Sequence, residues 1–167
     1  MQYIICALFI LIASVFRLVP HPPNFTPMLS IAILSGLYLE NKYAILVPIM
    51  IMLLTDIFIG FHISMYWVYI SLLLIFLIGK YLTKNSLISD ASHSVSSSIL
   101  FFILTNFGVW SMGGYSYTLN GLALCYTMAI PFFINTLAGT LLFSISGYFV
   151  LFYLKKFAVN RNLKNIY

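Results

Sequence analysis

Residues 43–60 decide the class of the fold, and they read YAILVPIMIMLLTDIFIG. The stretch is apolar over nearly its whole length and carries one charged side chain, Asp56, close to its end. An α-helix needs about 20 predominantly apolar residues to cross the hydrocarbon core of a bilayer. The stretch therefore predicts a membrane-spanning helix with an acidic residue near one end.

The composition of the whole chain agrees with this interpretation. Of the 167 residues, 62% are hydrophobic and 7% are charged, and the mean hydropathy is +1.05. These values are typical of chains embedded in a bilayer and exceed what a soluble core needs. A chain of this length has room for about six short-looped helices, so we expect one integral membrane domain, residues 1–167, and no separate soluble domain.

Apolar runs bounded by prolines and polar turns place the individual helices. Pro131 lies inside a long apolar run, 122–154, and we expect it to divide that run and leave a short helix at 122–130. The segment 105–121 is rich in glycine and aromatic residues, which favours a folded cap over one membrane face. The predicted membrane helices are about 2–18, 28–39, 43–60, 65–82, 94–110 and 131–154.

The cationic residues give the orientation. With six helices both termini lie on the same side, and that side carries seven of the eight Lys and Arg residues: Lys42, Lys80, Lys84, Lys155, Lys156, Arg161 and Lys164. Arg17 is the exception. Short cytoplasmic loops carry an excess of cations, so we expect cytoplasmic N- and C-termini in a multi-pass protein of the bacterial inner (cell) membrane. The same placement of the cations in loops and tail argues against nucleic acid as a partner.

Four polar residues then fall near the outer ends of four different helices: Arg17, Asp56, Asn106 and Asn135. Polar groups in hydrocarbon are costly unless they are paired or face a cavity. We therefore expect one shared, outward-facing pocket for a small-molecule solute. The outer connections add further candidate contacts, namely His21, Asn24, His62, Trp110, Tyr115 and Tyr117.

Each of these residues also has a purely structural interpretation. Arg17 can reach the outer headgroups, pair with Asp56 or hold a ligand anion, and Asp56 can bind the solute or form a structural ion pair. Asn106 and Asn135 are equally suited to hydrogen bonds between helices. The three aromatic side chains match an interfacial belt, and two loop histidines lack a metal-ligand spacing such as HxxxH.

The sequence carries no motif for a catalytic site. Nucleophile elbows, phosphate-binding loops and paired intramembrane carboxylates are missing, so we expect neither an enzyme nor a bound cofactor or metal. Cys6 and Cys125 are isolated, which predicts packing roles for both.

Two resemblances add to this picture. The run 17–27 (RLVPHPPNFTP), Asp56 with residues 60–62 (GFH), and residues 101–110 (FFILTNFGVW) resemble a family of small bacterial membrane proteins described only as candidate transport proteins. More broadly, the chain is similar to the substrate-binding S components of energy-coupling-factor (ECF) transporters, and residues 130–135 (IPFFIN) are similar to the element that opens their sixth helix. That similarity implies a six-helix bundle with a ligand near the outer face. It also implies an energising transmembrane and ATPase module as partner, although residues 2–18 lack the AxxxA pattern that docks S components on it.

The leading hypothesis is uptake or binding of a vitamin-like solute, with Asp56 contacting a polar or cationic group and the aromatic residues stacking on it. One alternative is an accessory subunit of a larger membrane complex that packs through Ala32, Gly36 and segment 108–121. Another is a redox or metal-handling enzyme that uses His21, His62 and Asp56.

Overall fold

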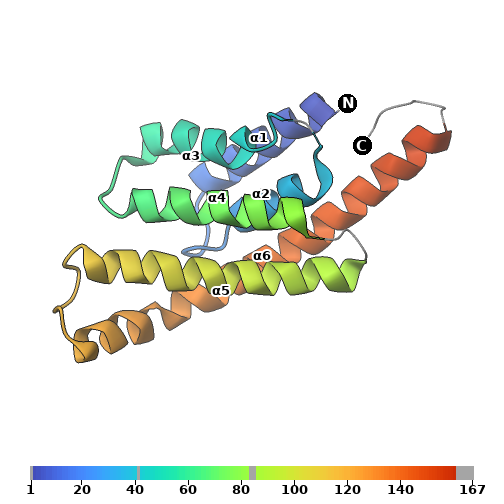
Figure 1. Cartoon of the computed structure of the whole chain (residues 1–167). Coiled ribbons are helices and arrows are strands. Elements are labelled where there is room, and N and C mark those ends of the chain that lie inside the picture. Colours follow the sequence, from blue (N-terminus) through green and yellow to red (C-terminus); the bar gives the residue numbers. More distant parts are fainter. Residues whose placement is uncertain (1, 41, 83–85, 161–167) are drawn as a thin grey trace.

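The computed structural model describes residues 2–40, 42–82 and 86–160, and within these ranges it contains helices and no strands. The predicted all-helical fold is confirmed. Figure 1 shows that helices alternate in direction, so α1 starts and α6 finishes at the same end of the bundle. The elements are α1 (Gln2–Leu18), α2 (Met28–Tyr38), α3 (Leu46–Ile59), α4 (Met65–Tyr81), α5 (Leu87–Ser111) and α6 (Leu119–Asn160).

Within the described residues, two helices are long and apolar enough to cross a membrane, Leu87–Ser111 and Leu119–Leu154, and the other four helices are apolar but shorter. Three cations that contribute to the charge asymmetry, Lys84, Arg161 and Lys164, lie outside the described residues.

Helix α2 forms the centre of the bundle. Every residue from Met28 to Leu37 is buried. Its close neighbour is α4, because a Cβ atom on Gly36 would lie 2.9 Å from the backbone nitrogen of Lys80 and 3.2 Å from the carbonyl carbon of Gly79. Small residues allow two helix backbones to approach in this way. Ala32 is 0% exposed, so the predicted packing face of Ala32 and Gly36 lies inside the bundle and is not available to a partner subunit.

Helix α5 begins at Leu87, well before the predicted position 94. Ser86 caps it, with its side-chain oxygen accepting from Ser89 N at 3.2 Å, and Asp90 occupies the first turn, where a negative charge is favourable. The serine-rich stretch is helical because hydroxyls bond the carbonyls one turn back, as Ser94 does to Asp90 at 2.8 Å. The predicted start of this helix at residue 94 was wrong.

Helix α6 is continuous through Pro131, so the predicted division into 122–130 and 131–154 was wrong. Packing against α5 on both sides of the proline holds the helix together: the Tyr126 hydroxyl donates to the Ile103 carbonyl at 2.7 Å, and Phe133 lies 4.9 Å from Phe102 between ring centroids. These contacts keep α6 packed against α5 on both sides of Pro131.

The predicted cap over residues 105–121 is also smaller than expected, because α5 is helical to Ser111 and only residues 112–118 form the connection. Trp110 Nε1 donates to the Ser116 carbonyl at 3.0 Å and closes the turn. Gly113, at φ 84°, provides the left-handed backbone that the reversal needs.

Helix α3 begins at Leu46 rather than at residue 43. Pro48 therefore stands in the first turn, where its missing N–H has no helical partner to lose.

Candidate functional site

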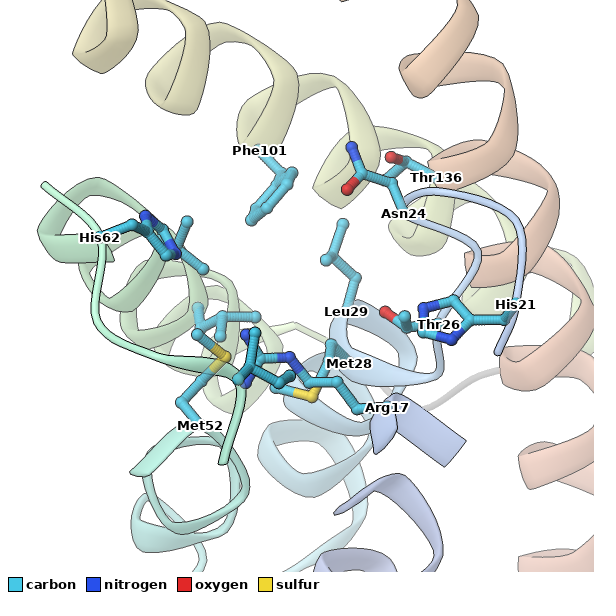
Figure 2. A pocket seen from close by; sticks show the side chains of 13 residues that line it. Arg17, His21, Asn24, Thr26, Met28, Leu29, Met52, His62, Phe101 and Thr136 are labelled. Carbon is cyan, nitrogen blue, oxygen red and sulfur yellow. The ribbon is translucent and has the colours of Figure 1, made fainter. Parts of the chain in front are cut away.

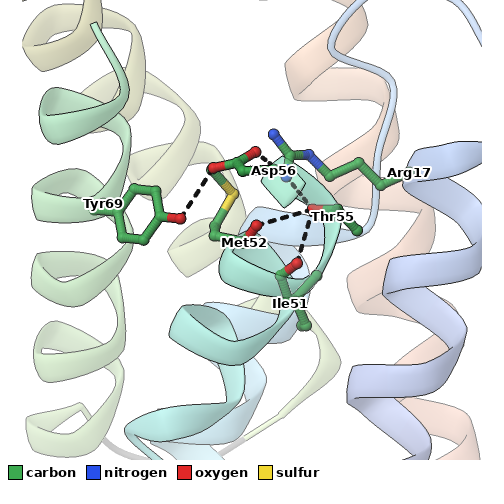
Figure 3. Close-up of polar contacts among 6 residues, drawn as sticks. All are labelled: Arg17, Ile51, Met52, Thr55, Asp56 and Tyr69. Carbon is green, nitrogen blue, oxygen red and sulfur yellow. Dashed lines mark hydrogen bonds and ion pairs between the residues drawn. The ribbon is translucent and has the colours of Figure 1, made fainter. Parts of the chain in front are cut away.

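Arg17 and Asp56 form a polar cluster where the ends of α1 and α3 meet α4 (Figure 3). Arg17 Nη1 lies 2.7 Å from Asp56 Oδ1 and also donates to the Thr55 hydroxyl. The other carboxylate oxygen, Oδ2, accepts from the Tyr69 hydroxyl at 2.9 Å. The Asp56 side chain is 0% exposed, so its charge is stabilised by these contacts rather than by water.

Local features of the sequence position Thr55 and Arg17 beside Asp56. Thr55 immediately precedes Asp56, and its hydroxyl donates to the Ile51 carbonyl at 2.7 Å, which turns the oxygen toward the end of α1. Arg17 is in the last turn of α1, whose helix ends at Leu18 before the prolines of the connection. Of the three interpretations of Arg17, the structure shows the pairing with Asp56.

A cavity of about 280 Å³ lies beside this cluster (Figure 2). It is formed by the connection between α1 and α2, the first residues of α2, and side chains from α3, α4, α5 and α6. The labelled side chains in Figure 2 are Arg17, His21, Asn24, Thr26, Met28, Leu29, Met52, His62, Phe101 and Thr136.

A second chamber of about 270 Å³ adjoins the first. The two share four lining residues, Asn24, Val68, Phe101 and Thr136. The second chamber extends between α5 and α6, and its wall also includes Phe102, Asn106, Val109, Phe132 and Phe133. Together the chambers reach the size range of small-molecule sites.

The connection 19–27 is held firmly over the first chamber. Asn24 adopts φ 63°, a left-handed conformation that asparagine tolerates. The Asn135 side chain of α6 donates to the Pro23 carbonyl at 3.0 Å, and Phe25 packs against Phe143, 5.8 Å between ring centroids. His21 Nδ1 lies 2.6 Å from the Val19 carbonyl, so Nδ1 is the donor and Nε2 is the ring nitrogen left for other contacts.

Five of the ten residues predicted to contact a solute line these chambers. Arg17, His21, Asn24 and His62 line the first, and Asn24 and Asn106 line the second. Asp56 lies behind Arg17 and lines neither, so its predicted direct contact with a solute is not what this geometry shows. Asn135 supports the connection 19–27.

The three predicted aromatic contacts also lie elsewhere. Trp110, Tyr115 and Tyr117 do not line either chamber. Trp110 and Tyr117 pack edge to face at 5.8 Å, and the Tyr117 hydroxyl donates to the Ser111 carbonyl at 3.2 Å. Both side chains thus stabilise the connection 112–118.

The sequence profile of DUF6580, a family of unknown function, matches residues 1–163. The chain belongs to this family. Neither the curated proteins nor the solved structures include a match to this DUF6580 chain.

The DUF6580 site includes residues that the sequence alone did not single out. Thr55 and Tyr69 form hydrogen bonds with the ion pair, and Phe101 and Thr136 line both chambers. Of these four residues, only Thr55 had a signal in the sequence, because it is adjacent to Asp56. Tyr69 lies in an apolar helix and Phe101 in the apolar half of α5, where periodicity does not distinguish a side chain that lines a cavity from one that faces outward.

A second buried acid, Asp90, lies before the predicted helix 94–110 and was overlooked in the sequence. Asp90 of α5 is 1% exposed, and its Oδ2 accepts from the Tyr38 hydroxyl at 2.6 Å. This contact ties the end of α2 to the start of α5. Among the described residues, no three His, Cys, Asp or Glu side chains are grouped so that they could hold a metal ion.

Replacing Tyr69 by phenylalanine is expected to lower the free energy of unfolding by about 1–3 kcal/mol, because Asp56 Oδ2 then loses its donor inside the protein. Thermal unfolding in detergent measures the effect. Tyr66→Phe is the matched control, since Tyr66 is on the same helix and 63% exposed. Equal unfolding temperatures for the two variants would show that the hydrogen bond does not stabilise the protein.

Proposed function

We propose that all six helices lie in a bacterial inner membrane, with both chain ends cytoplasmic. The distribution of side chains supports this arrangement, because many large apolar side chains cover the outer surface while several polar side chains are buried between helices. Large apolar side chains face outward, as Ile57 and Phe58 do at 66% and 76% exposure, whereas Thr55 and Asp56 between helices are fully buried. An apolar exterior of this extent needs lipid or a partner to cover it.

The charges of the described residues support the same orientation. Lys80 lies in the last turn of α4, at the end of the bundle where α1 begins and α6 finishes. Arg17 lies in the last turn of α1, at the other end. With the cation-rich end in the cytoplasm, the cavity opens toward the outer side of the membrane.

Within that arrangement the protein serves as a small-molecule uptake or substrate-binding component, with a solute of vitamin size in the two chambers. The observation that carries this function is the convergence of the connection 19–27, residue 62 and helices α5 and α6 on one cavity. Similar S components hold their ligand under the corresponding connections. Because the chain has no nucleotide-binding motif, the proposed energy source is a partner module or an ion gradient.

Native mass spectrometry of gently purified protein tests the function, and we expect a co-purified solute mass below that of a lipid. Thr136→Phe is expected to remove it, because Thr136 is 4% exposed and stands at the junction of the chambers. Thr127→Phe, on the exposed side of the same helix, should keep the solute.

The proposal is contradicted if no solute co-purifies and a panel of vitamins and related metabolites leaves the unfolding temperature of the wild-type protein unchanged. A stoichiometric partner protein in place of a solute would favour the accessory-subunit alternative. Unfolding curves for both threonine variants show whether a lost solute reflects a filled cavity or a damaged fold.

A further inference from the structure

Among the described residues, one edge of the Arg17 guanidinium has no hydrogen-bond acceptor. Its Nη1 contacts Asp56 and Thr55, whereas no described residue accepts a hydrogen bond from Nε or Nη2. The Arg17 side chain is 15% exposed and lines the first chamber. A planar pair of N–H donors on one edge of a guanidinium matches the two oxygens of a carboxylate.

The first chamber offers no acidic group to a cationic ligand. None of the described residues that line either chamber is Asp or Glu. Both oxygens of Asp56 have partners inside the protein, Arg17 for Oδ1 and Tyr69 for Oδ2. Asp56 therefore positions Arg17 and is shielded from the ligand.

The start of α2 adds to the positive character of the first chamber. Met28 and Leu29, the first residues of α2, line it. The N-cap residue Pro27 provides no side-chain acceptor for the first backbone N–H groups. Such a helix end carries a partial positive charge that favours an anion.

The second chamber has a different character. Its wall is largely aromatic and aliphatic, with Phe101, Phe102, Phe132 and Phe133 among its members. A ring or short hydrocarbon chain would be desolvated against these phenylalanines, with Thr105 and Asn106 among the polar residues that also line the chamber.

We propose that the solute is a small organic anion, with its carboxylate on the free edge of Arg17 and its apolar part between the phenylalanines of the second chamber. This inference rests on the proposed function and narrows its substrate class. Because Arg17 shares its charge with Asp56, we expect the carboxylate form to bind roughly tenfold to a hundredfold more tightly than an uncharged analogue. This is the range for one charge-assisted pair of hydrogen bonds.

Calorimetric titration with three matched probes tests the inference: 4-phenylbutyrate, 4-phenylbutanamide and 4-phenylbutylamine. For the wild-type protein we expect the acid to bind at least tenfold more tightly than the amide and the amine. Arg17→Gln combined with Asp56→Asn removes both charges and keeps hydrogen-bonding side chains at both positions, and it should abolish the preference. Lys80→Gln, which removes a cation at the other end of the bundle, should leave the preference unchanged.

Tighter binding of the amine or amide, or a preference for the acid that persists in the double variant, overturns the inference. So does the absence of binding by all three probes. The native mass spectrum then separates the two proposals. A neutral or cationic co-purified solute leaves the uptake function standing and removes only its anionic substrate class, whereas the absence of any solute removes both.

Discussion

Replacing Gly36 by valine is expected to prevent the protein from folding. The atoms that a Cβ at this position would meet all belong to the α4 backbone, including Lys80 N at 2.9 Å and the Gly79 carbonyl carbon at 3.2 Å. A backbone cannot rotate aside as a side chain can, so α2 and α4 would have to separate. Overpacking of this kind costs roughly 3 kcal/mol or more. Size-exclusion chromatography in detergent should show aggregate in place of a monodisperse peak.

A milder pair of variants keeps the test quantitative. Gly36→Ala should lower the free energy of unfolding by about 2 kcal/mol despite the better helix propensity of alanine. Gly139→Ala makes the same change in α6, where the nearest atoms to the added Cβ are 3.3 Å away, and should cost much less. Equal stability of the two variants would contradict the close α2–α4 contact.

Asp56→Ala is expected to lower the free energy of unfolding by about 3–5 kcal/mol, because it leaves the Arg17 charge partly buried without its partner. The neutral double variant Arg17→Gln with Asp56→Asn should recover most of this loss, since no uncompensated charge remains. Chemical unfolding of the wild-type protein, the single variant and the double variant measures the three free energies of unfolding.

The neighbouring position 57 provides the control for this series. Ile57 is 66% exposed, so Ile57→Ala should change stability little if its side chain faces lipid. If Asp56→Ala is no worse than Ile57→Ala, the ion pair is not a stabilising element. If the double variant is as unstable as the single one, the loss comes from packing rather than from charge.

Much of the helical fold could be predicted from the sequence because its signals are strong and local. The apolar run 43–60 and the prolines after Leu18 place the helices around them to within a few residues. Pro131 and the serines of 87–98 were misinterpreted, because tertiary packing and hydroxyl-to-carbonyl bonds outweigh local propensity there.

The candidate site could be predicted only in part. Grouping residues by depth brought Arg17, His21, Asn24 and His62 together, and the structure places all four around one chamber. Depth does not give direction, however. Asp56 and Arg17 lie at the same level, yet only Arg17 faces the cavity, because the Tyr69 hydroxyl and Arg17 occupy the oxygens of Asp56.

The short length of α2 also has a consequence for synthesis of the protein. Eleven residues of helix cover only about 16 Å, roughly half of a bilayer core. During translation α2 emerges before α4, α5 and α6, the helices that later surround it. In the proposed membrane arrangement, α2 therefore lacks most of the helices that bury it until the C-terminal half of the chain has been made. The central helix α2 is thus synthesised early but becomes packed late. The cavity beside it forms only when the chain is complete.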